Sequence, residues 1–309
     1  MRVCLMIEGQ EGVTRDEWVA LARAAEDARL EGLFRSDHYS AIVLPLEGSL
    51  DAWATLAALA TLTSTLRLGT MVSLATFRHP SVLARMATTV DHVSGGRVEL
   101  GMGAGWYERE HVENGIPYLD SKTRFDLFAE QVEIVVRTWT EEGFDHDGEH
   151  YTLRNQTALP KPVQQPHPPL ILGGAAKSRA AALAARFASE YDTGDSSPAE
   201  LRVKRDRLDA ACKEIGRDPA TLPLSMMVTA VVGRDRAEVD ERLARVRGLL
   251  SRFEMGAEQN WVQGTVDDVL EQFEKLEAAG VSRVFLQHLD HRDLDAVAVM
   301  GEIVRASAR

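Results

Sequence analysis

Two short segments carry residues that could do chemistry. In "FRSDHY" (34–39), His38 could exchange protons near neutral pH, and Asp37 could orient or charge its ring. In "GGAAKSR" (173–179), a glycine turn leads directly into a helix start, whose backbone amides and dipole attract anions such as phosphate. A helix cap beside a surface histidine and an ordinary tight turn would explain the same residues, so both hypotheses depend on the surrounding fold.

The segment "LGMGAGWYE" (100–108) places three glycines at alternate positions. A Rossmann fingerprint has the spacing G-x-G-x-x-G in the first strand-to-helix turn, with an acidic residue about 20 positions later, and this segment has a different spacing and place. Trp106 could form an aromatic wall against a flat ligand or close the core as a large hydrophobe. Glu108, Glu110 and His111 could supply acid–base chemistry or form a solvated first helical turn.

The sequence gives little support to a metal site or a hydrolytic triad. "DHDGEH" (145–150) contains five residues of metal-ligand type, but alternation along a hairpin would direct them to opposite faces. The H-E-x-x-H, P-loop and G-x-S-x-G motifs do not occur in the sequence. We therefore predict neither a metal centre nor a nucleophilic hydrolase.

The elements that must position these residues alternate regularly. Eight short apolar runs predict strands, and each is followed by at least one helix-length amphipathic segment. The predicted strands span 3–8, 33–38, 66–74, 97–103, 170–175, 189–195, 224–233 and 281–289. The predicted helices span 14–32, 51–64, 80–96, 121–142, 178–188, 198–216, 235–253, 265–280 and 293–308. This order predicts an α/β fold, a (β/α)8 TIM barrel, and not a doubly wound sheet.

The alternation is interrupted after the fourth strand and its helix. Residues 143–169 contain an Asp-Gly turn between two strand-like arms and a proline-rich run, which predicts an inserted hairpin and an extended linker. We expect residues 1–309 to form one barrel domain with this insertion. Because the carboxyl ends of barrel strands meet at one mouth, distant segments should share a site. The expected mouth residues are Glu8, Gly9, Ser36, Asp37, His38, 70–73, 103–108, 173–177, Gly194, Asp195, Gln287 and His288.

Composition narrows the choice of partners and compartment. The chain has 47 acidic and 35 basic residues, a net charge of -12, which argues against a general attraction to nucleic acid or anionic membranes. Cys4 and Cys212 fit no disulfide framework or zinc spacing and predict buried thiols in a reducing compartment. No apolar run approaches about 18 residues, and the N-terminal residues lack a signal-peptide pattern. We expect a cytoplasmic protein that acts on a small-molecule substrate.

Three segments together carry a family resemblance. They are "FRSDHY", "LRLGTMVSLATFRHPSVLARMATTVDHVSGGRVELGMGAGWYEREHVENGIP" and "LPKPVQQPHPPLILGGAAKS". The chain resembles the bacterial luciferase-like oxidoreductases, and most closely the branch that uses the deazaflavin coenzyme F-420.

The resemblance implies a flavin or deazaflavin lying across the strand ends, with hydride transfer at its central ring. His38, with Asp37 beside it, would lie near the reactive ring, and Met71–Val72 would back the ring, with a non-proline cis peptide. The implied cofactor-binding residues are Thr70, Met71, Val72, Gly103, Gly105, Trp106, Gly173, Gly174, Ala175, Ala176 and Lys177. A homodimer is implied as well, because the family is commonly dimeric.

One position departs from the family pattern. Some sugar-phosphate dehydrogenases of the family have a catalytic glutamate where this chain has Trp106, so that proton donor is missing. Glu108 or His38 could replace it, or the substrate could be of a kind that needs no acid there. The catalytic candidates are therefore His38, Asp37 and Glu108.

The leading hypothesis is an oxidoreductase that transfers a hydride between coenzyme F-420 and a small organic substrate. The alternative keeps the fold but uses reduced FMN and oxygen as a monooxygenase. A cofactor-binding protein without turnover and a metal-dependent barrel hydrolase are further interpretations. The deazaflavin carries an acidic tail, and the basic candidates to meet it are Arg35, Arg78, His79, Lys177 and Arg179.

Overall fold

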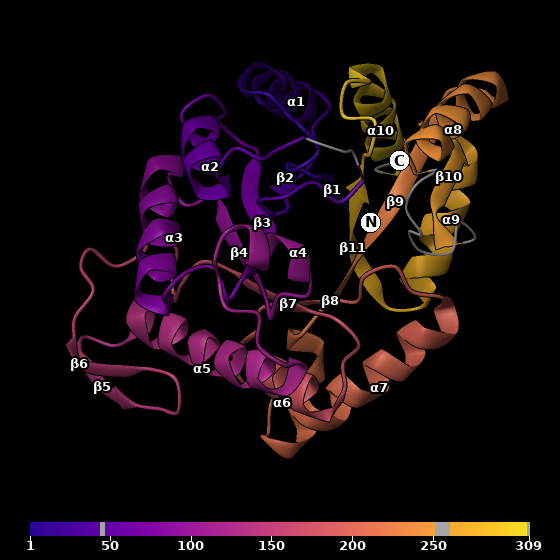
Figure 1. The fold of residues 1–309 in the computed structure, drawn as a ribbon. Helices are drawn as coiled ribbons and strands as arrows, with labels where there is room; N and C mark the ends of the chain where they lie inside the picture. The colour runs from indigo at the N-terminus through magenta and orange to yellow at the C-terminus, as the bar shows by residue number, and fades with distance from the viewer. Residues whose placement is uncertain (44–46, 251–259, 308–309) are drawn as a thin grey trace.

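The computed structural model describes residues 1–43, 47–250 and 260–307, and it contains a closed barrel of parallel strands surrounded by helices (Figure 1). Going round the barrel, each strand pairs with the next, and β11 pairs with β1 to close it. The barrel strands in this order are β1 (Arg2–Ile7), β2 (Gly32–Arg35), β3 (Arg67–Leu74), β4 (Val98–Gly103), β7 (Leu170–Gly173), β8 (Glu190–Asp192), β9 (Leu224–Gly233) and β11 (Val281–Gln287). The predicted TIM barrel is confirmed.

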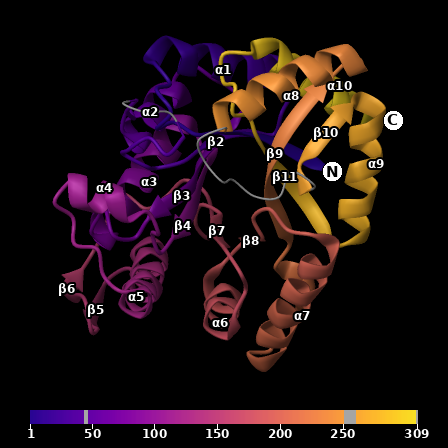
Figure 2. The same ribbon diagram turned by 45° about the vertical axis from the view of Figure 1, so that its right-hand side comes forward.

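The helices form the outer layer, as the turned view also shows (Figure 2). They are α1 (Arg15–Asp27), α2 (Ala52–Ala60), α3 (Pro80–Ser94), α5 (Ser121–Thr140), α6 (Ser178–Phe187), α7 (Pro198–Glu214), α8 (Arg236–Leu250), α9 (Val266–Ala278) and α10 (Leu294–Ser307). Their ends follow local chemistry: Thr14 and Glu17 form a capping box at α1, and Asp51 caps α2. The predicted helix residues 251–253 and 308 lie outside the described residues.

Some elements have no counterpart among the predicted ones. The short helix α4 (Glu108–Glu113) follows β4, and β10 (Val262–Thr265) pairs with β9 outside the barrel. Each is too short to give a periodic signal in the sequence. The hairpin of β5 (Phe144–Asp147) and β6 (Thr152–Gln156) is antiparallel and projects beside α5 (Figure 1).

A buried ion cluster fills the amino-terminal end of the barrel. Arg283 Nη1 lies 2.7 Å from a carboxylate oxygen of Glu99 and 3.3 Å from one of Glu190, and its Nε donates to Cys4 Sγ at 3.2 Å. An apolar cluster that includes Met6 and Phe285 packs inside the barrel. Because side chains fill the barrel from this end, the space for a ligand lies at the carboxyl ends of the strands.

A bulge in β3 explains the glycines of the segment 100–108. The Met71–Val72 peptide is cis, as the resemblance implies, and the pairing of β3 with β4 shifts register there. A Cβ on Gly101 would overlap the carbonyl oxygen of Thr70, and one on Gly103 would lie 2.6 Å from Val72 Cγ2. These glycines therefore let β4 run close against the bulge.

Candidate active site

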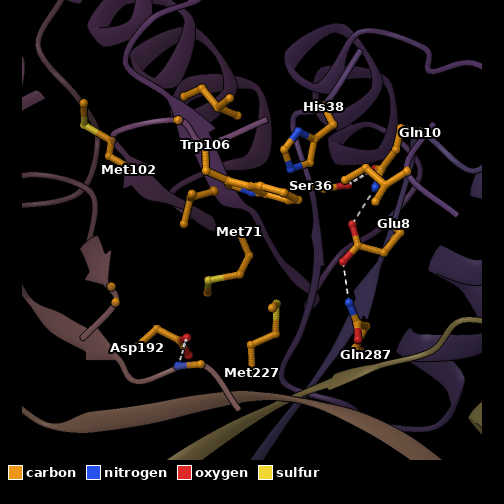
Figure 3. A pocket seen from close by; sticks show the side chains of 18 of the residues that line it. Glu8, Gln10, Ser36, His38, Met71, Met102, Trp106, Asp192, Met227 and Gln287 are labelled. Carbon is orange, nitrogen blue, oxygen red and sulfur yellow. Dashed lines mark hydrogen bonds between the residues drawn. The ribbon is translucent and has the colours of Figure 1, made fainter. Parts of the chain in front are cut away.

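A cavity of about 740 Å³ lies at the carboxyl ends of the barrel strands (Figure 3). Every barrel strand, or the turn directly after it, contributes to its wall: Glu8, Ser36, Met71, Gly103, Gly173, Asp192, Met227 and Gln287. Residues far apart in the sequence meet here because parallel strands present their carboxyl ends to one side. The sequence did not identify Asp192 or Met227 as mouth residues, nor Gln10, which also lines the cavity.

His38 lines the cavity and is held by Glu110, not by Asp37. His38 Nδ1 lies 2.8 Å from Glu110 Oε1, and the backbone N–H of Tyr39 donates to Glu110 Oε2 at 3.1 Å. Burial alone lowers the pKa of His38, but the hydrogen bond and charge of Glu110 outweigh it, so the pKa lies above its ordinary value. With Nδ1 engaged, Nε2 is the ring nitrogen left to exchange a proton with a ligand.

Asp37 has a different environment from the one the sequence suggested. Its carboxylate accepts from Arg78 Nη1 at 2.5 Å and from the hydroxyl of Ser73 at 2.8 Å. Burial raises the pKa of Asp37, although Arg78 and Ser73 act in the opposite direction. The hydrogen bond to His38 Nδ1 comes from Glu110, so the expectation that Asp37 orients the ring is corrected, but the charge of Asp37 does help to raise the pKa of His38, as expected.

Helix α4 decides which carboxylate reaches His38. Glu108 is exposed at the first residue of this helix and does not line the cavity, whereas Glu110 is completely buried. His111, also buried, lies 2.8 Å from Thr76 Oγ1 through Nε2 and 2.7 Å from the carbonyl oxygen of Tyr107 through Nδ1. The structure therefore does not bring Glu108 to the cavity, and it gives His111 a role in anchoring α4.

The segment predicted to hold phosphate is open at its glycines. Gly173 and Gly174 line the cavity, and Gly174 has φ 125°. Ala176 is buried and its N–H donates to the hydroxyl of Tyr191 at 2.9 Å. Lys177 is exposed and caps α6 without a side-chain hydrogen bond, so no side chain at that position satisfies the first amides of the helix. The N–H of Gly174 donates to the carbonyl oxygen of Asp192 at 3.0 Å, so the amides that fit an anionic group here are those of the first turn of α6, beside the bare glycine backbone.

Five of the six predicted ring-binding residues line the cavity, and Thr70 does not. Met71, Val72, Gly103, Gly105 and Trp106 line the cavity, and Figure 3 shows the Trp106 ring between His38 and Met71. The rings of His38 and Trp106 meet edge to face, with centroids 5.9 Å apart, and Trp106 is 56% exposed. An exposed indole at a cavity wall fits a flat ligand.

Thr70 does not reach the cavity. It is buried, and its hydroxyl donates to the carbonyl oxygen of Gly101 at 3.0 Å. Ala175 and Lys177 are exposed beside the cavity glycines but are not part of its wall.

Most of the basic residues expected to meet the acidic tail of the deazaflavin are bonded to other groups of the protein. Arg35 is buried and bonds to Ser36, Ser49 and Leu50, and burial lowers its pKa to about 10. The remaining engaged residues are Arg78 with Asp37 and Asp51, His79 as the cap of α3, and Arg179 with Asp126.

Besides Arg179, two exposed cations of the described residues lie at the phosphate segment. One is Lys177 and the other is Arg207 of α7, whose Nη1 donates to the carbonyl oxygen of Ala175 at 3.4 Å. Nothing in the local sequence around Arg207 signals this position, because only the packing of α7 against α6 brings it there.

The described residues contain neither a metal-binding cluster nor a membrane-spanning helix. Within residues 1–43, 47–250 and 260–307, no group of three His, Cys, Asp or Glu side chains is arranged to hold a metal ion. In the hairpin, His146 Nε2 lies 2.9 Å from Glu130 and Asp147 pairs with Arg154. No helix in the described part of the chain is long and apolar enough to cross a bilayer.

Comparison with known proteins identifies the family. Residues 3–305 match the model of the luciferase-like monooxygenase family, and the chain therefore belongs to it. Its relatives include an uncharacterised protein of Mycobacterium tuberculosis, 37% identical over 145 residues, which are 47% of this chain and 50% of that protein. They also include an FMNH(2)-dependent dimethylsulfone monooxygenase of Pseudomonas putida, 28% identical over 209 residues, or 62% and 56% of the two chains. The chain thus spans about half the length of these relatives.

Solved structures share the fold over the whole chain. An F420-dependent secondary alcohol dehydrogenase, solved in complex with an F420-acetone adduct, superposes with a TM-score of 0.84 at 19% identity, covering 99% of this chain and 98% of that one. The family is one of oxidoreductases and monooxygenases, with both F420-dependent and FMN-dependent members among the similar proteins.

Proposed function

We propose that this protein is an oxidoreductase that transfers a hydride between the deazaflavin coenzyme F-420 and a small organic substrate. The observation that carries the proposal is the cavity itself. One apolar space is bounded by the Met71–Val72 bulge, by the Glu110-held His38 and by the glycines 173–174. The apolar lining fits a planar ring, and the side-chain-free backbone at 173–174 fits an anionic tail.

The residues of the chain would divide the work between binding and proton transfer. The amides that begin α6 would hold the phosphate where the side-chain-free Gly173 and Gly174 let it approach, and Met71, Val72 and Trp106 would flank the ring. The coenzyme, when bound, supplies the hydride chemistry that no amino-acid side chain has. His38 Nε2 would take a proton from the substrate in oxidation or give one in reduction, and Glu110 would keep Nδ1 protonated.

The charges near the phosphate segment favour the deazaflavin. Lys177 and Arg207 are exposed there, and an oligoglutamate tail would gain from both, although solvent screening limits the gain. The second candidate is a monooxygenase that uses reduced FMN and oxygen, which the likeness to the Pseudomonas enzyme favours. We also propose that the protein is a homodimer, which analytical ultracentrifugation would test.

The proposal is tested by titrating the purified protein with oxidised coenzyme F-420 and, separately, with FMN. The fluorescence of each cofactor reports its binding. We expect tighter binding of the deazaflavin. Gly174→Val should weaken binding by about 10-fold or more, because a β-branched residue disfavours φ 125° and fills the approach to the amides. Gly216→Val puts the same change on a glycine with φ 73° at the end of α7, where a Cβ meets nothing within 4 Å, and should leave binding unchanged. A protein that binds neither coenzyme F-420 nor FMN would refute the proposal.

A further inference from the structure

One wall of the cavity is polar, and it lies across the barrel from the phosphate segment. Gln287 ends β11, Glu8 follows β1 and Ser36 follows β2, and these three strands are neighbours in the barrel. Strand β1 is four strands away from β7 in either direction round the barrel. The polar wall and the glycines 173–174 are therefore at opposite sides of the mouth.

Hydrogen bonds on this wall orient the side-chain amides of Gln10 and Gln287 toward Glu8 (Figure 3). Gln10 Nε2 donates to one oxygen of Glu8 at 2.9 Å, and Gln287 Nε2 donates to the other at 2.5 Å. The amide oxygens are satisfied in turn, that of Gln10 by the hydroxyl of Ser36 at 2.5 Å and that of Gln287 by the hydroxyl of Thr229 at 2.8 Å. Because a carboxylate can accept about four hydrogen bonds, Glu8 keeps capacity for a ligand donor.

The other residues that line the cavity do not neutralise the negative charge of Glu8. Among the described residues, no lysine or arginine lines the cavity, and Asp192 adds a second carboxyl group. The charge of a protonated His38 is balanced by Glu110 at 2.8 Å. Arg35 and a protonated His38 interact with Glu8. Arg35 does not line the cavity, however, and His38 is paired with Glu110, so an anionic ligand placed beside Glu8 would still be repelled.

The remaining lining is soft and apolar. Met71, Met102 and Met227 line the cavity, with Met71 and Met227 below the Trp106 ring and Met102 at the upper left of Figure 3, and unbranched thioether side chains adapt to ligands of irregular shape. The body of a ligand that reaches Glu8 therefore contacts hydrocarbon and sulfur, and its polar group contacts the carboxylate.

We infer that the substrate is a neutral or cationic molecule with an apolar body and a hydroxyl or amino group that donates a hydrogen bond to Glu8, and that carboxylates and phosphates are excluded from this wall. This inference rests on the proposed function, because it assigns the polar wall to the substrate of that same site.

Isothermal titration calorimetry with three probes of one shape tests it. Benzylamine, benzyl alcohol and benzoate share a ring with a one-carbon polar group and differ in charge at neutral pH. Each is titrated into the protein with and without the cofactor that the fluorescence titration identifies. We expect benzylamine and benzyl alcohol to bind about 10-fold or more tightly than benzoate, since hydrogen bonds to a charged group are worth at least that factor.

Matched variants assign the preference to Glu8. Glu8→Gln keeps the shape and should reduce the advantage of benzylamine over benzoate by about 10-fold or more. Glu149→Gln makes the same change of charge on an exposed residue of the hairpin turn and should leave the order intact. Circular dichroism shows whether Glu8→Gln folds, and if it does not, the order of the probes on the wild type decides alone.

Equal or tighter binding of benzoate, no binding of any probe, or an unchanged order in folded Glu8→Gln would each overturn the inference. If the protein binds neither cofactor, but shows the expected order of the probes and loses it in Glu8→Gln, only the proposed function is refuted. A protein that binds a cofactor but prefers benzoate would refute only the inference.

Discussion

Replacing Glu110 by glutamine is the sharpest test of how the site controls His38. The carboxylate accepts from His38 Nδ1 at 2.8 Å and from the Tyr39 backbone N–H at 3.1 Å. In Glu110→Gln the amide oxygen can keep the bond from Tyr39, so the amide NH₂ group faces Nδ1. Nδ1 must then accept, and the proton moves to Nε2. In its neutral form, the His38 ring of the variant would present Nε2–H to the ligand as a donor, whereas the neutral ring of the wild type presents Nε2 as an acceptor.

The structure sets the size of the effect. The Glu110 side chain is 0% exposed and that of His38 is 12% exposed, so solvent screens the pair little. A hydrogen bond to a charged group contributes about 1.5–3 kcal/mol, which is the loss expected in the free energy of unfolding when His38 is protonated. If His38 acts as a general acid or base, turnover should fall by about 10²–10⁴-fold.

The pH dependence has a definite sign. Because the folded pKa of His38 is raised above its unfolded value of 6.5, its contribution to stability is fully present below pH 6.5 and is lost as pH rises through the folded pKa. In Glu110→Gln burial, the largest influence, still lowers the pKa, and only the charges of Glu8 and Asp37 act against it, so protonation of His38 should stabilise the folded variant less than the wild type as pH falls. The variant should therefore lose most stability, relative to the wild type, in mildly acidic solution.

Nitrogen-15 NMR of the histidine ring and urea unfolding between pH 5.5 and about 9 measure both effects without a substrate. Glu113→Gln is the matched control, because it makes the same change on the exposed side of α4, where Glu113 bonds to Ser40 and Arg109. A ring of His38 that stays protonated on Nδ1 in Glu110→Gln, with stability unchanged across the range, would refute the reasoning.

Two further predictions concern stability. Gly101→Ala should destabilise the barrel by about 1–3 kcal/mol or more in urea unfolding, because the new Cβ overlaps the β3 backbone, whereas Gly248→Ala in α8, where a Cβ meets nothing within 4 Å, should be neutral or stabilising. Glu99→Gln should cost about 1.5–3 kcal/mol at pH 7, because buried Arg283 loses one charged hydrogen-bond partner and keeps Glu190 at 3.3 Å. Burial raises the pKa of Glu99, but Arg283 lowers it below its ordinary value, so this difference should shrink as pH falls through the folded pKa, and a constant difference would contradict it.

Glu110 illustrates where prediction from the sequence fails. In "YEREHVE" (107–113) the helix α4 buries Glu110 and leaves Val112 69% exposed, so the apolar residue does not mark the inner face. Glu108 and Glu110 lie on opposite sides of a helical turn. The sequence offered both carboxylates as candidates, and only the docking of α4 over the barrel mouth selects one.

The sequence by itself determined the barrel strands, the long helices and their order, because apolar periodicity, capping residues and glycine stops are local signals that do not depend on distant contacts. That order was enough to predict a closed barrel and a mouth that gathers strand ends. The tertiary structure decided the partners: His38 with Glu110, Asp37 with Arg78, and Glu8 between Gln10 and Gln287. Such pairs join residues up to 279 positions apart, and their hydrogen bonds depend on side-chain directions that only the packed chain fixes.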